Sequence, residues 1–147
     1  MLRPLLLALA VLLPTVGYSC PNLSGNFFNP SYSYQLQQTG CEKVNFRRAV
    51  AGSQFSEFIA ETGKTTSYAW KASPDIVRVD ESWSWNQAAL ELTQSMVSSS
   101  GQTKLKFVLS YSVNTDGLVE TLQSFSLVEG VFVANGSPTT RNFKRVR

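Results

Sequence analysis

Histidine is absent from all 147 residues of this chain. Its absence excludes the Ser-His-Asp and Cys-His arrangements of nucleophilic catalysis and removes the commonest metal ligand. Cysteine is nearly as scarce, because only Cys20 and Cys41 occur. If these two form a disulfide, no thiolate remains for a metal site or a nucleophile. The sequence therefore predicts a non-enzymatic protein without a cofactor or a bound metal.

The carboxylates and glycines also lack a catalytic pattern. Asp80 and Glu81 are adjacent, so in an extended segment their side chains point to opposite faces. Glu57 and Glu61 have the spacing of a solvated pair on a helix. The chain has no glycine-rich phosphate loop and no dinucleotide-binding fingerprint. A hydrolase that uses two carboxylates stays an open alternative.

Long apolar runs are missing from all but the start of the chain. Leu5–Leu13 is an almost uninterrupted apolar run behind Arg3, followed by small residues up to Ser19. This pattern predicts a secretory signal peptide over residues 1–19. The run is too short for a bilayer, which needs about 20 residues. We therefore expect residues 20–147 to be one exported domain without a transmembrane segment, in a bacterial periplasm or secreted.

The two cysteines lie close to the predicted mature N-terminus. A Cys20–Cys41 disulfide would close a loop of about 22 residues and stabilise the fold by roughly 3 kcal/mol. Lipidation of Cys20 is the competing interpretation. Lipobox cysteines follow Leu, a small residue, and Gly or Ala, whereas Tyr18 stands in the middle position here. The disulfide is the favoured prediction for an exported chain.

Positive and negative side chains nearly balance in this chain. The whole chain has a formal net charge of +3, and Arg3 belongs to the predicted signal peptide. Four basic residues fall within the last seven positions: Arg141, Lys144, Arg145 and Arg147. A cluster of only four charges is typical of a solvated chain end. We expect no nucleic-acid partner.

Two-residue alternation is the strongest positive pattern, and it is clearest between Gln102 and Leu127. A mostly apolar set recurs every second residue there, namely Thr103, Leu105, Phe107, Leu109, Tyr111 and Val113. Lysines and serines occupy most of the other parity, which predicts a half-buried strand. Asn114–Gly117 predicts a turn, and Leu118–Leu127 a second strand. This hairpin is too long to stand alone, so other strands must cover its apolar face.

The remaining segments are predicted to be mostly short strands separated by turns. One exception is the segment from Ala49 to Thr66, where the spacing of Phe55, Phe58 and Ile59 predicts a short helix. Trp83 and Trp85 are two residues apart, which places both indoles on one face of a strand. The pattern predicts an all-β fold, a single antiparallel up-and-down β-barrel of about eight strands with at most one short helix. An open sandwich is the alternative.

Aromatic side chains are plentiful on the predicted strands. Inside a closed barrel such rings either fill the interior as plain core or line a cavity for one small ligand. Tyrosine and tryptophan also bring a polar atom that needs a partner when it is buried. The predicted ligand-binding residues are Asn29, Tyr34, Tyr68, Trp70, Trp83, Trp85 and Tyr111.

The segment Leu23–Asn29 resembles the first strand of the calycins, the small barrels that include lipocalins and avidins. Lipocalins open with Gly-x-Trp, and avidins with a hydroxyl residue, Gly, x, Trp, x, Asn. Gly25 and Asn29 match this pattern, whereas Phe27 replaces the tryptophan. The resemblance covers about seven residues and implies a barrel. In the avidin comparison Asn29 and Ser33 would contact biotin, and Trp70 would resemble a pocket-wall tryptophan.

Two functions follow from these expectations. The first is an exported, non-enzymatic β-barrel that binds a small, largely apolar ligand in its interior. The alternative is an interaction module or inhibitor with a solid core that contacts an envelope or extracellular protein. Its contacts would then come from the segment 49–66 or from the loop around Ser99.

Overall fold

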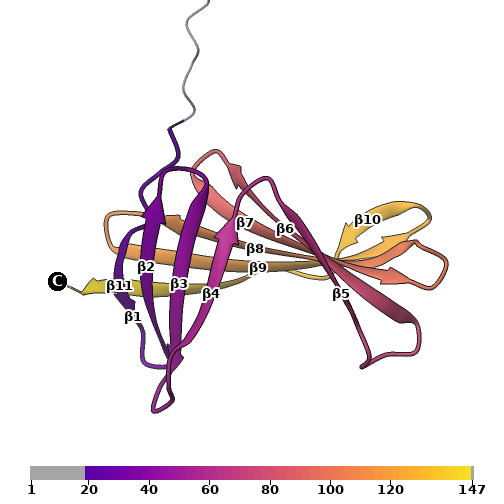
Figure 1. Ribbon diagram of the computed structural model, residues 1–147, viewed down its shortest axis with the longest axis horizontal. Coiled ribbons are helices and arrows are strands. Elements are labelled where there is room, and N and C mark those ends of the chain that lie inside the picture. Colours follow the sequence, from indigo (N-terminus) through magenta and orange to yellow (C-terminus); the bar gives the residue numbers. More distant parts are fainter. Residues whose placement is uncertain (1–18, 147) are drawn as a thin grey trace, which may run out of the picture.

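The computed structural model describes residues 19–146, so the predicted signal peptide lies outside the described residues apart from Ser19. The described residues form a sheet of 11 strands (Figure 1). The strands are β1 (Gly25–Phe28), β2 (Tyr32–Thr39), β3 (Lys43–Val50), β4 (Ser56–Glu61), β5 (Thr65–Ala69), β6 (Ile76–Asn86), β7 (Ala89–Ser98), β8 (Thr103–Val113), β9 (Gly117–Val128), β10 (Val131–Ala134) and β11 (Thr139–Val146). No helix long and apolar enough to cross a membrane occurs in this part of the chain.

The strand order confirms an all-β, antiparallel fold but corrects the predicted closure. The order is β4-β3-β2-β1-β11-β9-β8-β7-β6-β5, with β10 beside β9. The first and last strands pair, with Asn26 opposite Val146. The consecutive strands β4 and β5 are nevertheless the two ends of the order. The prediction of a closed barrel of about eight strands is therefore wrong, because the sheet is open and has 11 strands.

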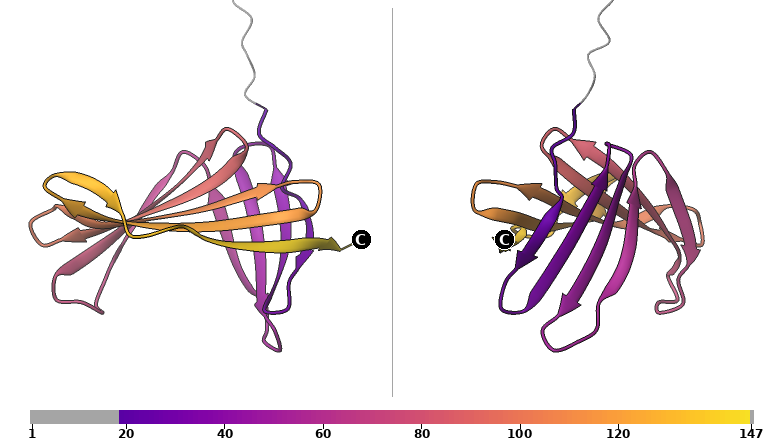
Figure 2. Two further views of the ribbon diagram at one scale, coloured as in Figure 1. Left: turned by 180° about the vertical axis from the view of Figure 1, so that it is seen from behind. Right: turned by 60° about the vertical axis from the view of Figure 1, so that its left-hand side comes forward.

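The chain just after β4, one end strand, meets β6, the strand beside the other end strand, at one point. Thr62, just after β4, forms an isolated parallel bridge with Trp83 of β6. The Gly63 N–H donates to the Trp83 carbonyl oxygen at 3.0 Å. Beyond this point β5 swings away from β4 (Figures 1 and 2). A seam joined only at one place cannot complete a barrel.

The open sheet therefore has two parts. In the lobe, β1–β4 fold over the near halves of the long strands β6–β9, and β11 connects the two layers. In the arm, β5, β10 and the far halves of β6–β9 continue as a single layer, as both further views show (Figure 2). We use "lobe" and "arm" in this sense below.

The hydrophobic core lies in the lobe, on what we call the inner face of the sheet. Alternation on β2 and β3 turns Tyr34, Leu36, Val44 and Phe46 inward, and all four are buried. Phe46 stacks on Phe58 of β4, with ring centroids 4.6 Å apart. Tight ring packing of this kind fills the space that a hollow barrel would leave empty.

The short helix predicted within residues 49–66 is wrong, since the predicted helical face at residues 55–59 falls largely on the strand β4. Phe58 points to the core, whereas Ile59 is exposed on the other face. The apolar residues at 55, 58 and 59 suit either a helical turn or an edge strand. Pairing with β3, where Glu57 lies opposite Arg47, satisfies backbone groups along one side of β4. A helix of one or two turns has no comparable support.

The predicted central hairpin is confirmed by β8 and β9, which pair with Tyr111 opposite Glu120. The Asn114 side-chain oxygen accepts the N–H groups of Asp116 and Gly117 and so fixes the turn. The Cys20–Cys41 disulfide is also confirmed. A bonded sulfur cannot carry a lipid, so the disulfide replaces the lipidation alternative.

Gly117 is the position least tolerant of a side chain. Its φ is +153°, and a Cβ there would lie 1.9 Å from the Phe143 carbonyl oxygen. We expect Gly117→Ala to lower the free energy of unfolding by about 3 kcal/mol or more, because backbone must move. Gly101→Ala is the control, since its φ is +80° but no atom lies within 4 Å. In urea unfolding, Gly101→Ala should lower the free energy of unfolding by about 1–2 kcal/mol. Equal losses in the two variants would contradict the crowding at Gly117.

Candidate functional site

The inner face of β8 is apolar from Leu105 to Val113, but strands of the lobe cover only part of that length. Tyr111 is buried in the core, and Leu109 and Val113 pack against that core. Leu105 and Phe107 have the same parity but lie in the arm, where they are half-buried. No second layer of strands covers the arm within residues 19–146 (Figure 1). The row of apolar side chains on β8 therefore extends beyond the part that β1–β4 cover.

Neighbouring strands widen this uncovered region. Leu92 of β7 and Leu122 of β9 both lie opposite Leu109, and Leu122 is 38% exposed. Met96 lies opposite Leu105. We call the resulting surface the open inner face and define it as Leu92, Met96, Leu105, Phe107 and Leu122. Trp83 of β6 lies opposite Leu92, so one indole borders the surface on its core side.

A hydrogen-bonded carboxylate lies beside the open inner face. The Glu81 Oε1 atom accepts from Gln94 Nε2 at 2.6 Å and from the Tyr68 hydroxyl at 2.8 Å. Gln94 is opposite Phe107, which places this group next to the apolar surface. Desolvation and the hydrogen bond to Glu81 raise the pKa of Tyr68 to about 12. Tyr68 thus remains a neutral donor at physiological pH.

A second carboxylate is buried in the lobe. Glu120 is 3% exposed, and it accepts from the Tyr34 hydroxyl at 2.5 Å and from Arg141 Nη1 at 2.7 Å. Burial, reinforced by the bond to Glu120, raises the pKa of Tyr34 above its ordinary value. Burial also raises the pKa of Tyr111, together with the nearby Tyr34 and Glu120. The hydrogen bond to Glu120 raises the pKa of Arg141.

Two guanidinium groups lie near the ring of Tyr32 beside this cluster. The Arg48 Cζ atom is 4.5 Å from the ring centroid, and the Arg141 Cζ atom is 5.2 Å from it. The buried Arg48 Nε atom has no hydrogen-bond partner among the described residues. Cation–π contacts hold both guanidiniums, while Glu120 forms its ion pair with Arg141. The cluster is a network of polar contacts that links β2, β3, β9 and β11.

Four of the seven predicted ligand-binding residues come together in the lobe. Tyr34 and Tyr111 are fully buried, with ring centroids 5.9 Å apart. Trp83 and Trp85 are half-buried and pack on the same core, so they share a face as predicted. The ring centroids of Trp83 and Tyr111 are 6.3 Å apart. The Trp85 indole N–H donates to the Cys41 carbonyl oxygen at 2.8 Å.

The other three predicted residues lie apart. The Asn29 side-chain oxygen accepts the N–H groups of Ser31 and Tyr32, which fixes the β1–β2 turn. Tyr68 is in β5 of the arm. Trp70 follows β5, and its backbone N–H donates to the Val77 carbonyl oxygen at 3.0 Å. These residues do not share a pocket with the core rings.

The open inner face itself was not among the predicted site residues. Leu105 and Phe107 belong to the alternating stripe that predicted β8, so the signal was present in the sequence. Alternation, however, says only that a face is apolar. It does not say where along the strand the covering layer ends.

Known proteins offer no guide to this site, because no family model, curated protein or solved structure matches the chain. The resemblance to calycins therefore stays a prediction.

The buried tyrosines should make the stability of the fold fall at alkaline pH. Folding raises the pKa of Tyr34 and Tyr111, whereas the unfolded chain ionises both near pH 10. Their contribution is therefore complete below about pH 10 and is lost above it, by up to about 1.4 kcal/mol per pH unit for each tyrosine. Between about pH 10 and pH 12, the free energy of unfolding should therefore fall less steeply with pH in Tyr34→Phe than in the wild type. The difference is the contribution of one tyrosine, up to about 1.4 kcal/mol per pH unit.

Phe143→Leu is the control for this measurement, because the Phe143 ring lies 5.1 Å from the Tyr34 ring and does not titrate. It should lower stability by a similar amount at every pH. An unchanged alkaline slope in Tyr34→Phe would contradict the raised pKa.

Proposed function

We propose that this protein is an exported, non-enzymatic binding protein that holds a small, largely apolar molecule on the open inner face. One observation carries the proposal. The apolar alternation of β8 runs unbroken from Val113 to Leu105, whereas β1–β4 cover only its lobe half. A face that alternates in this way is one that folding normally buries. A bound apolar molecule would supply the missing layer.

The interior of the lobe is a less suitable place for the ligand. The ring centroid of Phe46 is 4.9 Å from that of Tyr111 and 5.7 Å from that of Trp83, so these rings contact one another. Space for a ligand there would require the core to separate. The arm needs no such rearrangement, because Leu105 and Phe107 are already partly accessible.

The expected driving force is removal of apolar surface from water. Covering about 200 Å² of the open inner face would contribute roughly 5 kcal/mol. Association costs several kcal/mol in lost translational and rotational freedom. A ligand that binds measurably must therefore cover most of the surface and reach Trp83. The Glu81 carboxylate, which Tyr68 and Gln94 hold in place, gives the same surface one polar point at which a ligand can be oriented.

Titration followed by tryptophan fluorescence tests this proposal, because Trp83 borders the surface. We expect long-chain fatty acids, fatty alcohols or retinoids to shift the emission, with biotin as a comparison ligand. Phe107→Ser should weaken binding by about tenfold or more, since it removes apolar contact. Val108→Ser is the matched control on the opposite face of the same strand. Unchanged emission with every ligand class would count against the proposal.

A second candidate function rests on β10, an edge strand of the arm. Its residues Val131, Phe132 and Val133 are 64%, 39% and 49% exposed, and the strand carries no charge or proline. Exposed apolar edges of this kind pair readily with another strand. A second copy of this chain is the partner that we favour, because antiparallel pairing of two identical edges satisfies both at once.

Sedimentation velocity at increasing protein concentration tests the pairing of β10. Wild-type protein should form dimers, and Val131→Lys with Val133→Lys should remain monomeric because charges now line the edge. Lys104→Ala on β8, which does not pair with β10, is a control that should leave the dimer intact. A wild-type protein that stays monomeric throughout would rule out this use of the edge.

A further inference from the structure

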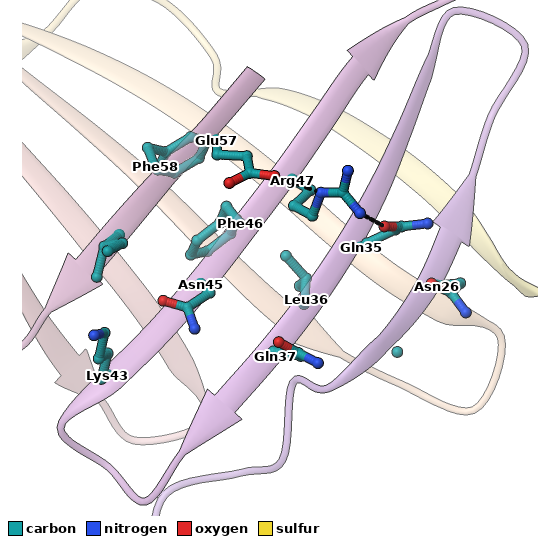
Figure 3. Close-up of a pocket in the computed structure, with 12 residues that line it drawn as sticks. Asn26, Gln35, Leu36, Gln37, Lys43, Asn45, Phe46, Arg47, Glu57 and Phe58 are labelled. Carbon is teal, nitrogen blue, oxygen red and sulfur yellow. Dashed lines mark hydrogen bonds and ion pairs between the residues drawn. The ribbon is translucent and has the colours of Figure 1, made fainter. Parts of the chain in front are cut away.

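The outer face of β1–β4, opposite the core, contains a shallow groove of about 760 Å³ (Figure 3). Side chains that alternate with the buried Leu36 and Phe46 point into it. The polar side chains that line it are Asn26, Gln35, Gln37, Lys43, Asn45, Arg47 and Glu57. Neither proposed function above uses this surface.

Strand register arranges part of this set in a straight row. Asn26 lies opposite Gln35, Gln35 opposite Arg47, and Arg47 opposite Glu57. Adjacent strands are about 4.8 Å apart, so the row crosses the groove at regular intervals. Gln37 and Asn45 form a second, parallel pair two residues along. The result is a ladder of planar polar groups on a rigid sheet.

The charges in the row cancel. Arg47 Nε is 2.7 Å from Glu57 Oε1, and Arg47 Nη1 donates to Gln35 Oε1 at 2.9 Å. These contacts hold the guanidinium flat across three strands (Figure 3). Lys43 adds one positive charge at the end of the groove. A net charge this small gives little attraction for a polyanion.

The carboxamides, in contrast, are free to bind. The side chains of Asn26, Gln37 and Asn45 form no hydrogen bond with any residue in the range 19–146. Each offers two N–H donors and one carbonyl acceptor. The groove therefore presents donors and acceptors together, a combination that suits a neutral ligand with many hydroxyl groups.

Two exposed rings lie on the same outer face. Phe28 is 51% exposed and lies two residues from Asn26 on β1. Phe55 is 42% exposed, and the Arg47 Cζ atom is 4.9 Å from its ring centroid. Large apolar residues exposed beside a polar groove point to a ligand with apolar patches of its own. The C–H face of a sugar ring is such a patch.

We propose that this groove binds a neutral oligosaccharide. Its hydroxyl groups would exchange hydrogen bonds with the free carboxamides and with the Arg47–Glu57 pair, while sugar rings pack against Phe28 and Phe55. Small apolar molecules are a poor fit, because the lining side chains are mostly polar. Acidic polymers are a poor fit, because Glu57 neutralises Arg47.

Isothermal titration calorimetry on residues 20–147 tests the proposal with four neutral hexasaccharides as probes: those of β-glucose, α-glucose, N-acetylglucosamine and β-mannose. At least one should bind. Replacing Gln37 and Asn45 together by alanine should weaken that binding by about tenfold, because two free carboxamides are lost. Thr93→Ala, in the arm, is the matched polar control and should bind as the wild type does.

Three results would overturn the proposal. One is no heat of binding with any of the four probes while circular dichroism shows an intact fold. Another is equal affinity in the wild type and the Gln37, Asn45 variant. The third is binding only to an acidic polysaccharide, with loss at raised salt, which would indicate charge recognition by Lys43 and Arg47. Phe107→Ser should bind the sugar normally, which separates this groove from the open inner face.

Discussion

The pairing of β1 with β11 is the constraint on which the rest of the structure depends. It joins the first strand to the last, with Phe27 opposite Arg145, and so brings β1–β4 over the long strands. Only then can Phe46 and Phe58 reach Trp83 and Tyr111 and form one aromatic core. The buried Glu120, held by Tyr34 and Arg141, links the same two layers through polar contacts.

This closure is incomplete, and its incompleteness creates the surfaces of interest. The strands β1–β4 run across the long strands, and side by side they cover only the near half of strands such as β9, which runs from Gly117 to Val128 (Figure 1). Among the described residues, the only backbone bridge across the seam between β4 and β5 joins Thr62, after β4, to Trp83 of β6. The arm therefore keeps an apolar inner face and a bare edge at β10, while the outer face of the lobe keeps its polar groove. Three surfaces of different chemistry result from one sheet.

Some features could be predicted from local pattern because local physics determines them. The alternation from Thr103 to Val113 and the turn after it gave the correct hairpin. Two lone cysteines in a chain with a predicted signal peptide gave the correct disulfide. The segment around Phe58 was predicted wrongly as a helix, because three apolar residues fit two periods and only the pairing of Glu57 with Arg47 favours a strand. Asn29 lies apart from the core aromatics because its side chain holds the β1–β2 turn, and Trp70 lies apart because it follows β5 in the arm. The sequence did not show that these two segments fall outside the core.

By itself the sequence determined that the chain would form antiparallel strands with one apolar face, since side chains alternate wherever the backbone is extended. It also determined that histidine chemistry is absent. Only the tertiary structure decided that the sheet stays open, which half of the apolar stripe is covered, and which polar side chains meet in a groove. Those outcomes depend on strand lengths, curl and register summed over the whole sheet, and no single segment encodes that sum.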